Sequence, residues 1–364
     1  MARLGDICEI LDSKRIPITA SNRKAGIYPY YGANGIQDYV DDYIFDDELV
    51  LLAEDGGHFG STDKPIAYRV SGKCWVNNHA HVLKPKDYLN VDYLCYSLMF
   101  RDVSSIVNGA TRQKLTQADM REIEIPLPAL NEQHVIVDNL NKIFTLIYLR
   151  KQQLSKLDEL VKSRFIEMFG DINTNDRGWD RQQLGELCTI VRGGSPRPIE
   201  NYLGGDVPWI KIGDATKGDN IYLHRTKEHI IQAGVTKSRL VKSGSLIFAN
   251  CGVSLGFARI ITFDGCIHDG WLAMEDIDER LDKVFLLQAL NQMTDHFRKI
   301  APAGTQPNLN TAIMKAYVQI IPPIELQKEY IAFVEQIDKS KFEIQKSIEK
   351  LETLKKALMQ KYFG

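Results

Sequence analysis

The fold is decided by the stretch from Leu130 to Gly170, which reads LNEQHVIVDNLNKIFTLIYLRKQQLSKLDELVKSRFIEMFG. No proline or glycine follows Pro128 until Gly170, and glutamine, lysine and glutamate are frequent, which predicts one long helix. Steps of alternately four and three residues mark ten positions along it, of which eight are apolar. An apolar heptad stripe of this length indicates a coiled-coil seam. The ten positions are Ile136, Leu140, Ile143, Ile147, Arg150, Leu154, Leu157, Val161, Arg164 and Met168.

The same pattern returns at the end of the chain with a constant offset of 194 residues, because Phe169-Gly170 corresponds to Phe363-Gly364. Eight of the ten offset positions are again apolar. Since a matching stripe is available within the chain, we expect the two helices to pair with each other, antiparallel about a pseudo-two-fold axis. An intermolecular coiled coil that forms a homodimer is the alternative. The second set is Tyr330, Val334, Ile337, Lys341, Ile344, Ile348, Leu351, Lys355, Leu358 and Tyr362.

The repeat includes the regions in front of the helices. Leu4-Gly-Asp-Ile-Cys8 recurs as Leu184-Gly-Glu-Leu-Cys188, an offset of 180 residues. The offset has grown to 194 by Leu309, so the second copy is 14 residues longer in this front region. Each copy therefore has a variable N-terminal region, which we call its front, followed by a constant C-terminal helix.

Both fronts are predicted to be mostly β with a few helices, because short apolar runs alternate with glycine, asparagine and aspartate. The fold class is accordingly α+β, with two mostly-β domains and two long helices that form an antiparallel coiled coil. Strands are expected at 48–53, 66–70 and 79–83, and at 207–212, 244–249 and 257–262 in the second copy. Helices are expected at 91–101 and 281–300.

The composition fits a folded protein of two globular domains, with 364 residues, 44% of them apolar and 25% charged. The longest apolar runs are far too short to span a bilayer, and the first residues do not resemble a secretory signal, so we expect a cytoplasmic protein. The six cysteines are scattered without a CxxC pair. They predict neither a zinc ribbon nor a disulfide framework, and we expect small buried side chains.

The net charge of −2 is unfavourable for binding to nucleic-acid phosphates. The second front is locally basic, with eight basic against four acidic residues between positions 205 and 260. The first front has no comparable surplus. If the chain binds DNA, either folding gathers its cations onto one face or partner subunits supply positive charge.

Several loops combine glycine, which allows close approach of the backbone, with side chains that can read base edges or stack on bases. The alternative for each residue is that it only forms a turn. The candidate DNA contacts in the first front are Tyr30, Tyr31, Asn34, His58, Asn78, His79, Arg112 and Lys114. Those in the second are Lys211, Lys217, Arg225, Arg239, Asn250, Ser254, Gln306 and Asn308.

No catalytic motif is recognisable. The sequence lacks a GxxxxGK[ST] phosphate loop, a GxGxxG turn after a strand, HExxH, and the Asn-Pro-Pro-aromatic motif of amino-methyltransferases. His79 and His81 are expected to share a strand face, but no further ligands of suitable spacing accompany them, so we predict no metal site. We therefore predict no catalytic residues.

These features together resemble the specificity subunits of type I restriction-modification systems, over nearly the whole chain. The resemblance is carried by the duplicated Leu-Gly-x-x-Cys starts, Tyr-Tyr-Gly-Ala-Asn-Gly, Glu-Asp-Gly-Gly, Leu-Pro-x-Leu-x-x-Gln and Phe-Gly-Asp. The entry to the second helix departs slightly from the Leu-Pro-x-Leu-x-x-Gln pattern, because it reads Pro322-Pro-Ile-Glu-Leu-Gln327. The resemblance implies target-recognition domains at 1–130 and 183–323, long spacer helices at 131–170 and 324–364, and a linker at 171–182.

What the resemblance implies is a non-catalytic subunit of an endonuclease and adenine-specific methyltransferase complex. Each domain reads one half of an asymmetric bipartite target in double-stranded DNA, and the helices fix the spacer. Two modification subunits dock on the helices, and restriction subunits join them. No cofactor is expected on this chain, since the methyl donor and ATP belong to the partners. The alternatives are a coiled-coil scaffold that binds proteins and a compact stand-alone DNA-modifying enzyme.

Overall fold

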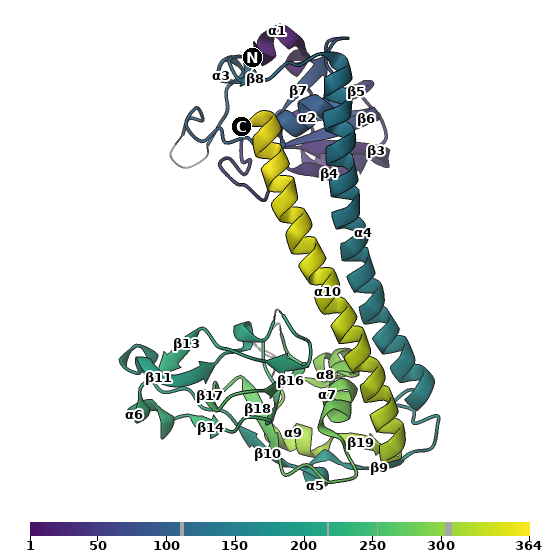
Figure 1. The fold of residues 1–364 in the computed structure, drawn as a ribbon, viewed down its shortest axis with the longest axis vertical. Helices are drawn as coiled ribbons and strands as arrows, with labels where there is room; N and C mark the ends of the chain where they lie inside the picture. Colours follow the sequence, from purple (N-terminus) through teal and green to yellow (C-terminus); the bar gives the residue numbers. More distant parts are fainter. Residues whose placement is uncertain (110–112, 217, 253, 303–307) are drawn as a thin grey trace. The chain divides into compact units, whose positions relative to one another are not determined.

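Figure 1 shows the computed structural model of the chain, which describes residues 1–109, 113–216, 218–252, 254–302 and 308–364. The chain divides into two compact units. Unit 1 contains Met1–Gln152 and Ile344–Gly364, and unit 2 contains Gln153–Glu343. Each unit therefore combines one mostly-β domain with a part of each long helix, as the α+β prediction requires.

The two long helices are α4 (Leu130–Phe169) and α10 (Ile324–Phe363), each of 40 residues. In unit 2 their segments run antiparallel, because Asp158 pairs with Lys341 at 2.6 Å and Arg164 pairs with Glu329 at 2.9 Å. In unit 1 the segments are also antiparallel, since Lys151 pairs with Glu352 at 3.4 Å and Lys355 Nζ lies 5.6 Å from the centroid of the Phe144 ring. The predicted pairing of the two helices within one chain is confirmed.

The predicted seam residues lie on the packed faces of these helices, and none of them is exposed. The stripe is apolar where it meets the partner helix, which removes its surface from water at about 25 cal/mol per Å². Nine of the twenty seam positions are buried, namely Leu140, Ile143, Ile147, Val161, Tyr330, Val334, Ile337, Ile344 and Ile348. The other eleven are partly buried, namely Ile136, Arg150, Leu154, Leu157, Arg164, Met168, Lys341, Leu351, Lys355, Leu358 and Tyr362.

The domain of unit 1 is built on a six-stranded sheet of order β2-β7-β5-β6-β3-β4, in which only the β3–β6 pair is parallel. The central strand β5 carries the run Leu49 to Ala53, every residue of which is fully buried. A separate two-stranded sheet joins β1 to β8. The strands are β1 (Ala2–Arg3), β2 (Cys8–Ile10), β3 (Ala25–Gly32), β4 (Gly35–Val40), β5 (Phe45–Ala53), β6 (Ala67–Val76), β7 (Ala80–Pro85) and β8 (Glu124–Ile125).

Three short helices complete the part of this domain that the structure describes. The longest, α2, begins where the Asn90 side chain accepts hydrogen bonds from the N–H groups of Asp92 and Tyr93. Its buried face, including Tyr93 and Leu94, belongs to the same apolar core as Val50 and Leu52 of β5. The helices are α1 (Leu4–Ile7), α2 (Val91–Met99) and α3 (Gln117–Arg121), with 3₁₀ turns η1 (Asp12–Lys14) and η2 (Ala20–Asn22).

The domain of unit 2 contains a five-stranded sheet of order β10-β18-β15-β16-β12 and a four-stranded sheet of order β13-β11-β17-β14. A third sheet pairs β9 with β19. The strands are β9 (Asp180–Gln183), β10 (Thr189–Arg192), β11 (Leu203–Ile210), β12 (Tyr222–Leu223), β13 (Glu228–Ile230), β14 (Arg239–Val241), β15 (Leu246–Ala249), β16 (Ala258–Ile261), β17 (Gly265–Ile267), β18 (Trp271–Glu275) and β19 (Val318–Ile321).

The short helices of unit 2 include a pair where the sequence predicts one helix over 281–300. The first helix ends at Gln292 and a second begins at Thr294, whose hydroxyl lies within hydrogen-bond distance of the carbonyl oxygens of Asn291 (2.8 Å) and Gly256 (2.6 Å). The helices are α5 (Leu184–Leu187), α6 (Gln232–Val235), α7 (Lys283–Gln292), α8 (Thr294–Ile300) and α9 (Thr311–Ala316), with 3₁₀ turns η3 (Ile199–Asn201) and η4 (Ile212–Asp214).

The internal repeat is visible in the backbone pairing. Ala2 pairs with Ile125 in unit 1, and Gln182 pairs with Gln319 in unit 2, which reproduces the offsets of 180 and 194 residues. All six cysteines are free, and Cys251 alone of them is not buried. Among the described residues, no helix combines the length and the apolar character needed to cross a membrane.

Candidate nucleic-acid interface

Four loops of unit 1 meet at the end of strand β5. The Asn34 side chain donates a hydrogen bond of 3.0 Å to the carbonyl of Gly56, which joins the β3–β4 turn to the loop after β5. His79 lies 2.9 Å from the Asp55 carboxylate, and Asp55 forms a backbone bridge with Lys114. We call this group the unit 1 loop cluster. It comprises residues 33–35, 54–58, 77–79, 108–109 and 113–114.

A glycine in the left-handed region shapes the loop after β5. Gly56 has a φ of 63°, a conformation that side chains other than glycine rarely adopt. Gly252 has a φ of 74° at the corresponding place after β15 in unit 2. The two domains therefore turn the chain in the same way after equivalent strands.

Most of the candidate residues of unit 1 present their side chains to solvent in or near this cluster. Tyr31 is partly buried against Tyr68, with ring centroids 5.7 Å apart, and burial raises the pKa of the Tyr31 hydroxyl. Arg112 lies outside the described residues. The exposed candidates are Asn34, His58, Asn78 and Lys114, and His79 is partly exposed.

Tyr30 is a correction to the sequence prediction. Its side chain is 1% exposed, and its hydroxyl accepts a hydrogen bond of 2.9 Å from the N–H of Ile18. The glycine and asparagine residues around it predict a loop, but Tyr30 lies in β3 and points into the domain. A base cannot reach it in this structure, so it is removed from the candidate set.

A second correction concerns the histidines. His79 precedes β7, whereas His81 lies within that strand and is 1% exposed, so the two do not share a strand face. His81 instead belongs to a buried network under the unit 1 loop cluster. Its Nδ1 lies 2.6 Å from Asp12 Oδ2, and its Nε2 lies 2.9 Å from the carbonyl oxygen of Leu115.

The network also holds the carboxylates of Asp12 and Glu54 and the cationic side chains of Arg15 and Lys114. Glu54 pairs with Arg15 and, at 2.9 Å, with Lys114. Burial alone would raise the pKa of Glu54, but its hydrogen bonds to Arg15 and Lys114 outweigh burial and lower the pKa. Sequence analysis missed Asp12, Arg15 and Glu54, because no local spacing relates them and only the sheet brings them together.

Asp12, Glu54 and His81 are the one group among the described residues that has the composition of a metal site, with ligand atoms within 4.8 Å of one another. Their ligand positions are already engaged. Arg15 and Lys114 bind the Glu54 carboxylate, and both nitrogens of His81 face hydrogen-bond acceptors. The carboxylates are therefore compensated by Arg15 and Lys114 without a metal ion.

Unit 2 has an equivalent loop cluster after β15. Cys251 forms a backbone bridge with Asn308, and the N–H of Leu309 donates a 2.8 Å hydrogen bond to the carbonyl of Asn250. In unit 1 the N–H of Leu115 donates the corresponding bond of 2.7 Å to the backbone carbonyl of Glu54. We call residues 250–252 together with 308–309 the unit 2 loop cluster.

Asn250 is the third correction. Its side chain is 0% exposed and donates hydrogen bonds to Asn308 at 3.1 Å and to the carbonyl of Leu309 at 3.2 Å. Asn250 therefore stabilises the unit 2 loop cluster from within the domain, and it is removed from the candidate set. Asn308 and Ser254 are partly exposed and stay in it.

The other described candidates of unit 2 are not members of this cluster. Lys211 pairs with Glu228 and lies over the Trp209 ring, 5.7 Å from its centroid. Arg225 and Arg239 are exposed. Lys217 and Gln306 lie outside the described residues.

Unit 2 also contains a charged group that sequence analysis missed. Asp269 accepts a hydrogen bond of 2.7 Å from Ser195 and pairs with His268 at 3.0 Å and Arg197 at 3.5 Å. Burial would raise the pKa of Asp269, but the Ser195 hydrogen bond and the nearby cations lower it. The signal in the sequence was Arg192-Gly-Gly-Ser-Pro-Arg197, in which two exposed arginines flank a glycine pair.

The two loop clusters occupy the same place in two copies of one domain type, and the sequence comparison explains why. The model of the type I restriction modification DNA specificity domain matches residues 1–159 and 176–356. The chain belongs to this family. Its two copies of the specificity domain correspond to the two repeats found in the sequence.

Individual relatives agree with the family. The chain is 29% identical over 355 residues to a putative type I restriction enzyme specificity subunit of Haemophilus influenzae, covering 92% of this chain and 86% of the relative. It is 24% identical over 325 residues to a type I restriction enzyme specificity subunit of Methanocaldococcus jannaschii, covering 82% and 74%.

Solved structures share the fold. The S subunit of a type I restriction-modification system from M. genitalium matches with a TM-score of 0.60 at 16% identity, covering 100% of this chain and 95% of that chain. A chain from a study of complex assembly and conformational transition of the type I R-M system matches with a TM-score of 0.61 at 18% identity, covering 100% and 96%.

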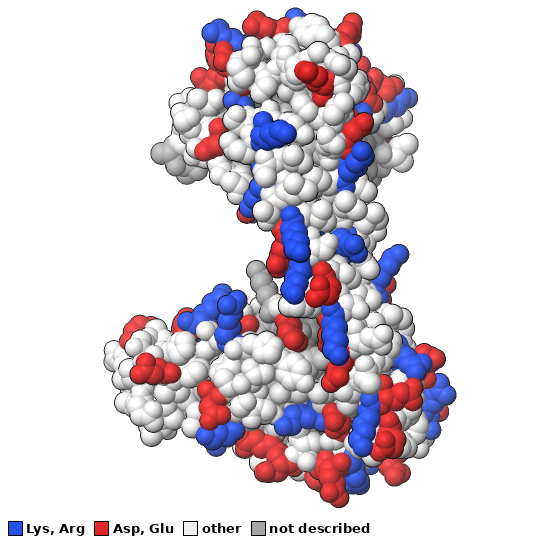
Figure 2. Space-filling view, in the orientation of Figure 1, with Lys and Arg blue, Asp and Glu red and all other residues white. Residues whose placement is uncertain are grey.

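On the drawn face of this specificity protein, positive and negative charges are mixed rather than segregated. Figure 2 shows Lys and Arg side chains interspersed with Asp and Glu over the drawn face of each unit. Many of the cations are paired, as with Lys242 and Asp264 at 2.7 Å or Lys84 and Asp47 at 2.6 Å. Non-specific attraction to phosphate is therefore weaker than on a strongly basic DNA-binding domain.

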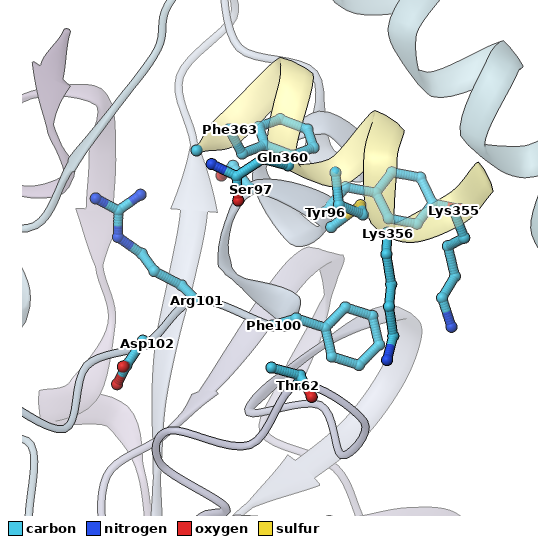
Figure 3. Close-up of a pocket in the computed structure, with 12 residues that line it drawn as sticks. Thr62, Tyr96, Ser97, Phe100, Arg101, Asp102, Lys355, Lys356, Gln360 and Phe363 are labelled. Atoms are coloured by element: carbon cyan, nitrogen blue, oxygen red, sulfur yellow. The ribbon is translucent and has the colours of Figure 1, made fainter. Parts of the chain in front are cut away.

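A cavity of about 520 Å³ lies in unit 1 where the specificity domain meets the end of α10 (Figure 3). Tyr96 and Phe100 line it from the α2 side, and Phe363 and Lys355 line it from α10. Phe363 also packs edge-on against Tyr93, with centroids 5.3 Å apart. Aromatic rings thus attach the C-terminal end of α10 to the first domain, as Phe169 does for α4 against Phe285 in unit 2 at 4.8 Å.

Proposed function

We propose that the chain is the specificity subunit of a type I restriction-modification complex and reads an asymmetric bipartite target in double-stranded DNA. The observation that carries the proposal is the duplication of the loop cluster. Each unit places exposed or partly exposed polar side chains in the loops beside equivalent strands, β5 and β15. Side chains so positioned can hydrogen-bond base edges in a groove, and two such sites read two half-sites.

The two half-sites differ in sequence under this proposal, because the clusters carry different chemistry. Unit 1 offers Asn34, His79 and Lys114 around the Glu54–Asp55 turn. Unit 2 offers Asn308 and Ser254 beside a cysteine, and neutral groups replace the ion pair. Different arrays of donors and acceptors select different base pairs.

The long helices are the proposed docking surface for two modification subunits. Both helices keep large apolar side chains exposed outside the seam, and exposed apolar residues of this kind often mark a protein interface. Restriction subunits join the complex through the modification subunits. The exposed residues are Leu146, Leu149, Leu160, Ile166, Phe342 and Leu354.

The chemistry belongs to the partners in this proposal. Modification subunits bring the methyl donor and methylate adenine, and restriction subunits bring ATP-dependent cleavage. Their basic surfaces also supply phosphate contacts that this chain, with a net charge of −2, provides only in part. The chain itself supplies the base contacts and the spacing.

The experiment is to map methylated adenines in the genome of a host with and without the gene. We expect one split, asymmetric motif to lose methylation on deletion and to regain it on complementation. A methylome that stays unchanged in a host whose modification subunit is active rejects the proposed function.

A further inference from the structure

We propose that Arg192 and Arg197 bind phosphate groups of the DNA backbone beside the half-site read by unit 2. The inference rests on the proposed function and adds the residues that hold this domain on the duplex. Both belong to residues 192–197, which read Arg-Gly-Gly-Ser-Pro-Arg and which we call the arginine segment. A phosphate contact fixes the position of a protein on DNA and does not itself read the sequence.

The arginine segment begins at the same end of the five-stranded sheet as the unit 2 loop cluster. β10 ends at Arg192 and β15 ends at Ala249, and both strands pair there with the start of β18. Residues 268–270 form the turn that leads into β18. The N–H of Asn250 donates a 3.0 Å hydrogen bond to the carbonyl of Gly270 in this turn. The loop cluster and the arginine segment therefore border one edge of the domain.

Close backbone packing fixes the arginine segment beside that turn. The N–H of Gly193 donates a 2.9 Å hydrogen bond to the carbonyl of Trp271, and the N–H of Gly194 donates one of 3.0 Å to Ile267. A Cβ atom added at Gly193 would overlap the carbonyl oxygen of His268, so this approach requires glycine. Both glycine N–H groups are used within the domain, so the arginine side chains are the groups that can meet a phosphate.

Asp269 orients both arginines. Its carboxylate pairs with Arg197 at 3.5 Å and accepts a 2.7 Å hydrogen bond from the hydroxyl of Ser195. Its backbone carbonyl accepts a 3.1 Å hydrogen bond from Arg192 Nε. Because a guanidinium has five N–H donors, each arginine keeps donors for a phosphate while it is held in place.

Both arginines are accessible to a ligand although they are anchored. The side chain of Arg197 is 79% exposed, and Arg192 is exposed as well. An ion pair so close to solvent contributes little to stability. Arg197 can therefore exchange the Asp269 carboxylate for a phosphate at small cost.

Positive charge gathers at this edge of unit 2. Burial lowers the pKa of His268, and the carboxylate of Asp269 opposes this effect. The charges of Arg197, Lys211 and Arg192 act in the same direction as burial. The three cations therefore lie within electrostatic reach of one side chain. Folding brings them to one edge of the domain, where a polyanion such as DNA is attracted.

Unit 1 directs the corresponding segment inward. The offset of 180 residues aligns Arg192 with Asp12 and Ser195 with Arg15. Asp12 is 8% exposed, and the side chain of Arg15 is 12% exposed because it pairs with Asp12 and Glu54. The phosphate contact proposed for this segment is therefore confined to unit 2.

The experiment measures DNA binding by the full chain in complex with its modification subunits over a range of salt concentrations. The duplexes carry the motif found by methylome mapping, or that motif with one base-pair change in either half. Arg192→Ala and Arg197→Ala should each weaken binding about tenfold at about 0.1 M salt. Each should also lower the slope of log K against log salt by about 1. The loss should be equal for every duplex, because a phosphate contact carries no sequence information.

Control variants separate phosphate binding from other effects of the substitution. Arg280→Ala removes the same charge from another exposed pair, in which Arg280 lies 2.8 Å from Asp278 beyond the far end of β18. It should leave the salt slope unchanged. Arg192→Lys and Arg197→Lys keep the charge, so their slopes should stay close to that of the wild type. Melting temperature and assembly with the modification subunits show whether each variant folds.

Three results overturn the inference. The first is a wild-type salt slope in both alanine variants. The second is an equal decrease of the slope in Arg280→Ala, because the effect then reports only the total charge. The third is a loss confined to duplexes with an intact unit 2 half, which assigns the arginines to base reading. If the wild type binds every duplex alike and both alanine variants lower the slope, the proposed function fails and the phosphate contact stands.

Discussion

The side-chain oxygen of Gln133 accepts a hydrogen bond of 2.8 Å from the backbone N–H of Asn90, which is the N-cap of α2. Gln327 makes the same bond of 2.8 Å to Asp282, the N-cap of α7. Both glutamines are fully buried, and each also donates to the carbonyl of the proline before its long helix, at 2.9 Å for Pro128 and 2.7 Å for Pro322. The glutamine shared by both repeats therefore fixes each long helix to its own domain.

Gln133→Ala and Gln327→Ala should each lower the free energy of unfolding by about 1–3 kcal/mol, because each leaves buried backbone groups without partners. Gln345→Ala, at an exposed position of α10, is the matched control and should change stability by less than about 0.5 kcal/mol. Denaturant unfolding of the three variants gives the comparison. Equal midpoints for all three would contradict a role of the glutamines in attaching the helices.

The long helices and the repeat were predictable because their signals are local or periodic. A heptad stripe needs no knowledge of the rest of the fold, and a constant offset of 194 residues aligns Gln133 with Gln327 directly. Each of the six predicted strands overlaps a strand of the structure, with boundaries up to six residues apart, whereas the remaining strands were not predicted. The break between α7 and α8 was missed, because it depends on a contact of Thr294 with Gly256, which is distant in sequence.

The candidate site was predictable only as a set of loops. Glycine and asparagine mark turns but do not give the direction of neighbouring side chains, so Tyr30 and Asn250 were assigned to the surface although both are buried. The network around His81 could not be predicted from the sequence for another reason. The sheet brings Asp12, Glu54 and His81 together, because β7 lies between β2 and β5. The order of strands in a sheet cannot be inferred from a local sequence pattern.

Exchange of residues 1–128 for the corresponding segment of another family member should change one half of the recognised motif and leave the other half intact. The exchanged segment contains the sheets of unit 1 and its loop cluster but none of unit 2. Methylome sequencing of a host that carries the hybrid gene measures both halves at once. A change in both halves would show that the two domains do not read DNA independently.

Insertion of one heptad into both long helices, between Gln152 and Gln153 and between Glu343 and Ile344, should lengthen the spacer of the motif. Seven helical residues add about 10 Å, which corresponds to about 3 base pairs of B-DNA. The heptad keeps the seam in register, so the helices still pair. A four-residue insertion at the same places is the control and should impair assembly. An unchanged spacer in the heptad variant, with methylation retained, would contradict the proposal that the helices set it.

The Asp12 carboxylate should make the stability of unit 1 sensitive to acid. Its pKa is lowered from an ordinary value of 3.8, so it stabilises the folded state at neutral pH, and this contribution is lost as the pH falls through the folded-state pKa. Asp12→Asn should therefore reduce stability at pH 7 and differ less from the wild type at about pH 3. Asp295→Asn, at a side chain that is 90% exposed, is the control and should leave the profile unchanged. Denaturant unfolding across this pH range tests the sign, and a penalty for Asp12→Asn that grows toward low pH would contradict it.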